Sequence, residues 1–136
     1  SRIFILLTTP PEHVIRSAEV KITIMERDAK MKTLYVVRSN PTEGRDQEFN
    51  HWYDNVHFPE VMKVEGFLSA ERFELNAVNS WGEQLYRYLA IYEISSDNVS
   101  GTLENIKNAG LNMSGAIDLA NVHVSVFGAV GKPLEK

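Results

Sequence analysis

From residue 33 onward, the pattern of hydrophobic and polar positions predicts six elements in the order β-α-β-β-α-β. Strand patterns, in which side chains alternate between two faces, are expected at 33–38, 67–75, 84–94 and 121–130, and helices at 45–57 and 97–108. This order is typical of a four-stranded antiparallel sheet that carries both helices on one face. The pattern therefore predicts an α+β fold of the ferredoxin-like type.

Both faces of the predicted sheet are too apolar to face water. In the last strand, Val122, Val124 and Val126 share one face, and His123, Ser125 and Phe127 share the other. In the third strand, Tyr86, Tyr88 and Tyr92 alternate with Arg87, Leu89 and Ile91. We expect a homodimer in which two open sheet faces meet and enclose a cavity lined by rings, hydroxyls and histidines. The alternative is a monomer whose open face is covered by a loop or by the N-terminal segment.

The first thirty residues differ from the rest. An apolar run at 3–7 and a strand-like alternation at 20–24 end in a polar break at 27–30, and Met31 then opens the strong strand pattern. We expect residues 1–30 to be an N-terminal extension, for which an extra hairpin is one form. We expect residues 31–136 to be the dimeric α+β barrel domain. The run at 3–7 is too short for a membrane span or a signal-peptide core, so we expect a cytoplasmic protein with no membrane contact.

Composition narrows the function classes. The 136 residues, 43% of them hydrophobic, fit one globular domain, and a net charge of -4 with no cluster of basic residues argues against nucleic acid as a partner. The chain has no cysteine, which excludes disulfides, a thiolate nucleophile and cysteine-ligated metals. No glycine-rich phosphate-binding motif occurs. His51 and His57 are six residues apart and point to different faces of one helix, so we expect no metal site and no cofactor.

The most informative stretch is the first helix with its following proline. Its apolar stripe has the i, i+3, i+4, i+7 spacing of a core-facing helix and consists of Phe49, Trp52, Tyr53 and Val56. His57 falls at the edge of this stripe, and Pro59 predicts that the helix ends at this histidine. The helix dipole would raise the pKa of His57, whereas burial against Trp52 and Tyr53 would lower it, and the sequence leaves both outcomes open. A structural histidine that only caps the last carbonyls is the alternative.

These residues resemble a known family. The segments Trp52-Tyr53-Asp54, His57-Phe58-Pro59, Val64-Glu65-Gly66-Phe67 and Arg72-Phe73 are similar to the pattern of the EthD-like branch of the dimeric α+β barrel superfamily. Glu65 stands where that pattern usually has proline. The resemblance implies a small homodimer with a hydrophobic pocket between helices and sheet, in which His57 corresponds to the pocket histidine and Trp52 and Tyr53 to its aromatic neighbours. Relatives include cofactor-free cyclases, monooxygenases, lactone isomerases and haem enzymes, so the fold does not fix the reaction.

We therefore expect a cofactor-independent enzyme of the cyclase, isomerase, dehydratase or monooxygenase type that acts on a small hydrophobic, phenolic or polyketide-like molecule. An imidazole is suited to move a proton next to a carbonyl, and a phenol can donate to the enolate oxygen that develops. The expected catalytic residues are His57 and Tyr53, and the expected substrate-binding residues are Trp52, Phe58, Tyr86, Tyr88, His123 and Phe127. Two alternatives stay open: a non-catalytic protein that binds a hydrophobic metabolite in an oxidative degradation pathway, and haem bound through one histidine.

Overall fold

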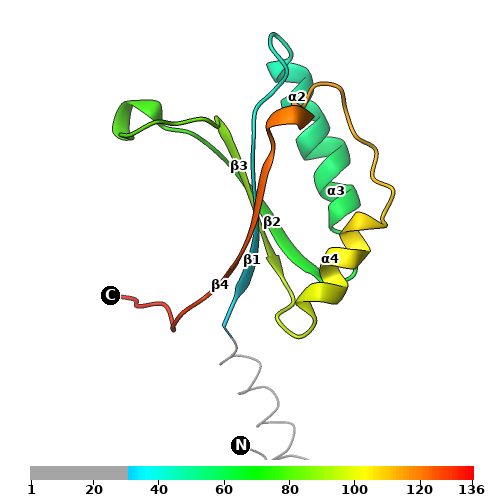
Figure 1. Ribbon diagram of the computed structural model, residues 1–136, viewed down its shortest axis with the longest axis vertical. Coiled ribbons are helices and arrows are strands. Elements are labelled where there is room, and N and C mark those ends of the chain that lie inside the picture. Colours follow the sequence, from blue (N-terminus) through cyan, green and yellow to red (C-terminus); the bar gives the residue numbers. More distant parts are fainter. Residues whose placement is uncertain (1–30) are drawn as a thin grey trace, which may run out of the picture. The chain divides into compact units, whose positions relative to one another are not determined.

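Within residues 31–136, which the computed structural model describes, four antiparallel strands form one sheet in the spatial order β2-β3-β1-β4 (Figure 1). The strands are β1 (Thr33–Ser39), β2 (Phe67–Glu74), β3 (Tyr88–Ile94) and β4 (His123–Gly128). With the helices between β1 and β2 and between β3 and β4, this order confirms the predicted ferredoxin-like α+β fold. The compact unit spans Lys32–Ala129. The predicted extension, residues 1–30, lies outside the described residues.

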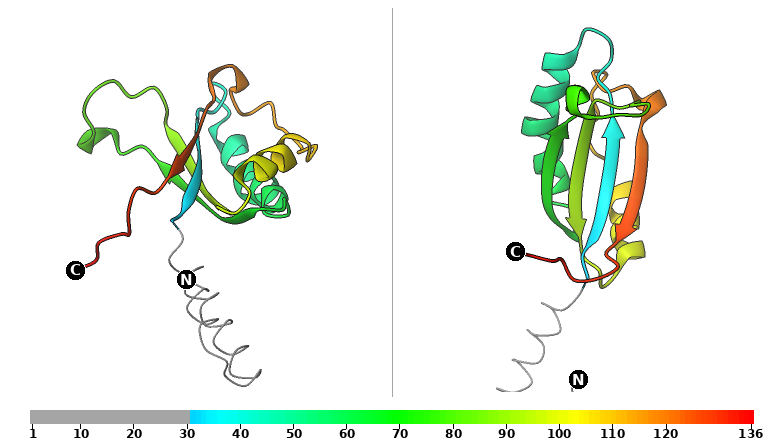
Figure 2. Two further views of the ribbon diagram at one scale, coloured as in Figure 1. Left: turned by 60° about the horizontal axis from the view of Figure 1, so that its bottom comes forward. Right: turned by 90° about the vertical axis from the view of Figure 1, so that its left-hand side faces the viewer.

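The helices cover one face of the sheet and leave the other open (Figure 2). We call the covered side the inner face and the other side the open face. On β1, Tyr35 and Val37 belong to the inner face, where they pack with the helices and with Tyr92 of β3. Val36 and Arg38 alternate with them and belong to the open face. The hydrophobic core therefore lies between the inner face and the helices.

The first helical segment runs past the predicted end. It consists of α2 (Asp46–Trp52), a π-helical turn η2 (Tyr53–His57) and α3 (Phe58–Val61), so the prediction that the helix ends at His57 is wrong. Proline in an α-helix interior removes an i to i−4 hydrogen bond and clashes with the preceding turn. In the wider π-turn, Phe58 N–H donates to the carbonyl of Tyr53, five residues back, and Pro59 falls in the first turn of α3, where a missing N–H is tolerated.

Three elements begin two or more residues later than the sequence pattern predicts. The third strand begins at Tyr88, because residues 75–87 form a long connection with a short 3-10 turn, η3 (Ala77–Asn79), that projects away from the open face (Figure 1). The second helix, α4 (Val99–Lys107), begins after Asn98, whose side-chain oxygen accepts from Gly101 N at 3.0 Å. A 3-10 turn, η4 (Leu119–Asn121), precedes β4. Among the described helices, none combines the length and apolar character that a membrane span needs.

A tight turn joins α3 to β2 at Gly66. Its φ of 101° lies in a region that favours glycine, and a Cβ placed there would lie 2.0 Å from Thr102 Oγ1 on α4. Its carbonyl accepts from Ser95 N at 2.8 Å. Gly66 therefore allows the end of the first helical segment, the start of β2 and α4 to approach one another closely.

Candidate functional site

A cavity of about 140 Å³ lies between the inner face and the helices. Its walls come from β1, β3, β4, the π-turn, α4 and the segment before β4. The lining residues are Tyr35, Val37, Trp52, Tyr53, His57, Val61, Tyr92, Ile106, Met113, Ile117, Leu119, Val122 and Val124. We call this space the His57 cavity. Three phenols and one imidazole supply all the ionisable side chains in its lining.

His57 is buried against two rings of its own helix. Its imidazole stacks on Trp52, with ring centroids 4.5 Å apart and planes inclined by 26°, and meets the edge of Tyr53 at 5.0 Å. Only 9% of the residue is exposed, and Nδ1 is buried without a hydrogen-bond partner among the described residues. Burial lowers the pKa of His57 to about 4, against a smaller opposing effect of the Glu60 carboxylate. Burial thus decides the protonation state, and the imidazole is neutral at pH 7.

The segment between α4 and β4 forms one wall of the cavity and is attached to the first helical segment through Asn112. Trp52 Nε1 donates to the Asn112 carbonyl at 2.9 Å. The backbone N–H and side-chain amide of Asn112 donate to the two oxygens of Glu60, at 3.0 and 2.7 Å. Met113 and Ile117, which follow Asn112, line the cavity. Three hydrogen bonds therefore hold the segment between α4 and β4 to the helical segment that carries His57.

Two phenols lie deep in the site. Tyr53 and Tyr92 are almost fully buried, and burial raises the pKa of both. The nearby Tyr53 phenol raises the pKa of Tyr92 further, and Tyr92 Oη is buried beside it. Both phenols keep their protons at neutral pH. They can therefore donate a hydrogen bond.

Arg72 on β2 contacts the helical segment that carries His57 from the inner face of the sheet. Its guanidinium lies over three rings, with 4.8 Å to the Tyr53 centroid and longer distances to Phe49 and Tyr88. It donates to the side chain of Asn50 and, at 2.9 Å, to Asp54 Oδ1. Arg72 does not line the His57 cavity, but it packs on the ring of Tyr53, which does.

Of the residues expected in the site, the structure brings only some together. His57, Tyr53 and Trp52 line the His57 cavity. Phe58 packs against the rings of Tyr53 and Tyr92, at 5.5 and 5.3 Å between centroids, behind the cavity wall. Tyr88 is buried on the inner face with its ring 5.0 Å from Phe49 and also borders a pocket on the other side of the sheet.

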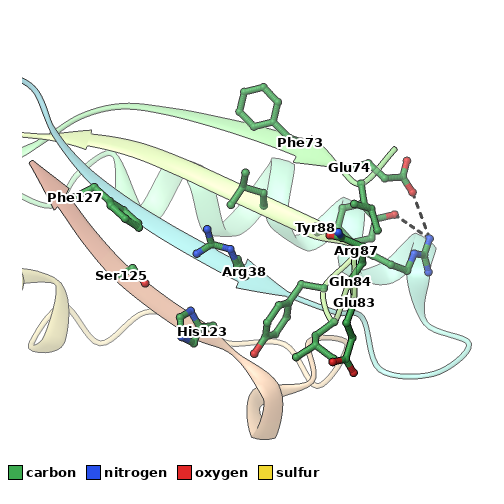
Figure 3. Close-up of a pocket in the computed structure, with 14 residues that line it drawn as sticks. Arg38, Phe73, Glu74, Glu83, Gln84, Arg87, Tyr88, His123, Ser125 and Phe127 are labelled. Carbon is green, nitrogen blue, oxygen red and sulfur yellow. Dashed lines mark hydrogen bonds and ion pairs between the residues drawn. The ribbon is translucent and has the colours of Figure 1, made fainter. Parts of the chain in front are cut away.

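Tyr86, His123 and Phe127 line that second pocket, on the open face. It has a volume of about 630 Å³ and lies between the sheet and the 75–87 connection. Figure 3 shows His123, Ser125 and Phe127 along β4 with Arg38 of β1 beside them. The Tyr86 and His123 rings are 6.2 Å apart. The sheet therefore separates these three residues from His57, and the expectation that Tyr86 shares a strand face with Tyr88 and Tyr92 is wrong, because Tyr86 precedes the start of β3.

Two site residues were not singled out from the sequence. Tyr92 was recognised only as part of an alternating strand, and Asn112 lay in a segment without a periodic pattern. Their importance arises from contacts with residues distant in the sequence, such as the 2.9 Å bond between Trp52 and Asn112, which are 60 positions apart. In the part of the chain that the structure describes, no three His, Asp or Glu side chains are grouped so that they could hold a metal ion.

Comparisons with known proteins give one likeness of fold. No family model matches the sequence, and no curated protein matches it. Among solved structures, the chain is similar to an ethyl tert-butyl ether d (EthD) family protein from Bacillus halodurans, with 17% identity, a TM-score of 0.42 and coverage of 76% of this chain and 99% of that chain. This neighbour carries the family name that the sequence motif also resembles. The assignment to the ferredoxin-like class rests on the element order and strand order of this chain.

Proposed function

We propose that the protein is a cofactor-independent enzyme that moves a proton on a small hydrophobic molecule held in the His57 cavity. The observation that carries the proposal is the buried, neutral imidazole of His57 in an otherwise apolar cavity, with phenols on the same walls. A neutral imidazole can accept a proton, and a buried phenol can donate a hydrogen bond to the oxygen that becomes negative. Tyr53, whose ring contacts His57, is the proposed partner in this step.

The reaction begins with a substrate that carries a carbonyl group. His57 removes a proton from the carbon next to the carbonyl, the electron pair moves onto the carbonyl oxygen, and the Tyr53 phenol donates a hydrogen bond to that oxygen. Returning the proton to another position completes an isomerisation.

The low pKa of His57 in the empty cavity is compatible with this role. The cavity contains no opposite charge that would stabilise an imidazolium ion. The enolate formed in the reaction is such a charge, and attraction to it raises the pKa of His57 as the proton is transferred.

The test is deuterium exchange at the carbon next to the carbonyl, followed by NMR in D2O with a panel of one-ring ketones and lactones. We expect wild type to exchange at least one member, and His57→Gln to lower the exchange rate by about 10² or more, as is usual for a general base. His51→Gln, an exposed histidine on the same helix, is the matched control and should keep the rate. Unchanged exchange in His57→Gln would remove this residue from the mechanism, and compounds that bind to wild type without exchange would favour the metabolite-binding alternative.

We further propose that the protein is a homodimer whose copies meet through the open face. The apolar character of this face supports the proposal, since Phe73 and Phe127 are 42% and 50% exposed there. Its charges are also self-complementary: Arg38 lies towards one end of the strands and Glu93 towards the other, and neither has an ion-pair partner among the described residues. A two-fold axis across the strands would bring Arg38 of one copy to the end where the partner's Glu93 lies.

A further inference from the structure

We infer that the 75–87 connection of each copy is an interface element for a second copy of this chain. Trp81 packs into a hollow on the partner's open face, and Glu83 pairs with the partner's Lys32. The inference rests on the proposed homodimer, because it names the segment that completes that interface. It concerns residues outside the His57 cavity, so it is independent of the proposed reaction.

The 75–87 connection carries large apolar side chains that its own subunit leaves exposed. Val78, Trp81 and Leu85 are 93%, 89% and 64% exposed. The connection extends on the side of the sheet opposite the helices, which is the side of the open face (Figure 1). Exposed apolar groups that lie together are typical of protein–protein contacts, and tryptophan is among the residues that contribute most to their affinity.

Hydrogen bonds fix the connection to β1 and stabilise its tip. The side chain of Asn40, which follows β1, accepts from Arg87 N at 2.8 Å and donates to the Leu85 carbonyl at 2.9 Å. Near the tip, Gln84 Nε2 donates to the Trp81 carbonyl at 2.9 Å. A segment that is already ordered loses little conformational entropy when it docks, which favours association.

A hollow on the open face can receive the tip of the connection. It lies over β1, β2 and β3 and extends to Lys32, which precedes β1. Leu34, Phe73 and Ile91 supply apolar surface in its lining, and Ser69 supplies a hydroxyl. Such a mixed lining suits an indole ring, which has an apolar body and one polar N–H.

The register of the sheet brings the connection and the hollow together in the proposed dimer. In the pairing of β1 with β3, Arg38 lies two rows after Val36, and Glu93 lies two rows before it. A two-fold axis across the strands at Val36 therefore places Arg38 opposite the partner's Glu93. Asn40 lies four positions after Val36 and Lys32 four positions before it, so the same axis places the base of the connection at the partner's Lys32.

The charges at this contact are complementary. Glu83 borders the pocket between the sheet and the 75–87 connection, on the face where the partner docks (Figure 3). Neither Glu83 nor Lys32 has an ion-pair partner among the described residues. One axis thus pairs Arg38 with the partner's Glu93 and Glu83 with the partner's Lys32, and such complementarity fixes the register of an interface.

The first experiment measures the dissociation constant of the dimer by analytical ultracentrifugation. Trp81→Ala should weaken the dimer about 30-fold, which corresponds to about 2 kcal/mol. Met113→Ala removes a half-exposed apolar side chain from the helix side of the sheet and is the matched control, which should leave the constant unchanged. An unchanged constant in Trp81→Ala would overturn the inference.

A charge exchange tests the position of the contact. Glu83→Lys and Lys32→Glu should each weaken the dimer about tenfold, because each places like charges together. The double variant should return to within about threefold of wild type, because the two positions interact. If the two losses add in the double variant, Glu83 does not meet the partner's Lys32 and the proposed docking position is wrong.

Fluorine NMR of protein labelled with 5-fluorotryptophan tests the burial of Trp81 directly. Trp52 and Trp81 are the two tryptophans of the chain, so Trp81→Phe assigns both signals. The Trp81 signal should differ between the wild-type dimer and the Arg38→Glu monomer, and the Trp52 signal should not. If wild type is a dimer but the Trp81 signal is the same in both, the inference fails and the homodimer stands. If wild type is a monomer at every concentration, the homodimer itself fails and the inference fails with it.

Discussion

Replacement of His57 should remove a measurable part of the pH dependence of folding. The perturbation is His57→Gln, which keeps a planar polar side chain but removes the titratable ring. In the folded protein the pKa of His57 is about 4, whereas the ordinary value for a solvated histidine is 6.5. The folded state therefore holds the neutral form, and the unfolded chain takes up a proton at a higher pH than the folded chain does.

The sign and size follow from proton linkage. Above pH 6.5 the ring is neutral in both states, so its full contribution to stability is present. As the pH falls below 6.5, the unfolded state gains a proton that the folded state does not bind until about pH 4, and the free energy of unfolding decreases. With these two pKa values, the loss attributable to His57 is about 2 kcal/mol at pH 5 and approaches about 3 kcal/mol at pH 4.

The assay is urea unfolding followed by tryptophan fluorescence at several pH values between 7 and 5, a window in which most carboxylates stay ionised. Wild type should lose about 2 kcal/mol more than His57→Gln over this range, whatever the cost of the substitution at pH 7. His51→Gln, which removes an exposed histidine from the same helix, should retain the wild-type dependence. If the free energy of unfolding changes with pH in the same way for wild type and His57→Gln, burial does not hold His57 neutral. The proposal of a neutral imidazole as the general base would then be refuted.

Two further substitutions test other parts of the structure. Gly66→Ala should destabilise the protein by more than about 1 kcal/mol, because the new Cβ would meet Thr102 and the backbone has positive φ; Gly44→Ala has positive φ but open space around it, so urea unfolding should show a smaller loss. Arg38→Glu should dissociate the proposed dimer in sedimentation-velocity experiments, and adding Glu93→Arg should restore association; if neither variant changes the sedimentation coefficient, the open face is not the interface.

The architecture could be predicted from the sequence because it depends on local periodicity. The alternation from Thr33 and the apolar stripe at Phe49 and Trp52 each specify an element and its buried side without reference to distant residues. Strand ends were less predictable. Tyr86 continues the alternating pattern of β3 but lies in the 75–87 connection. The pattern did not reveal this, because a strand ends where its neighbour no longer pairs with it, and alternation along one strand does not contain that information.

The site was predictable only where one helix carries it. His57 and Tyr53 meet because residues four apart on a helix are neighbours, and the sequence shows that spacing. Trp52, five residues before His57, stacks on it across the π-turn. Tyr92 and Asn112 reach the same place through tertiary packing, from a strand and from an irregular segment. Their contacts, with the Tyr53 phenol for Tyr92 and with Trp52 and Glu60 for Asn112, depend on atoms that no local pattern identifies.

The π-turn also explains why burial decides the protonation of His57. A helix that ended at this residue would place unpaired carbonyls beside the imidazole, and a terminal dipole can favour the charged form by up to about 2 kcal/mol. In the structure the helix continues to Val61, and the effect of the dipole fades within the last turn. Burial against Trp52 therefore acts on His57 with little opposition, and a shift of the pKa from 6.5 to about 4, worth about 3 kcal/mol, becomes possible. The same proline that suggested a helix end, where a dipole would favour a cationic histidine, is accommodated by a turn that carries the helix past the histidine.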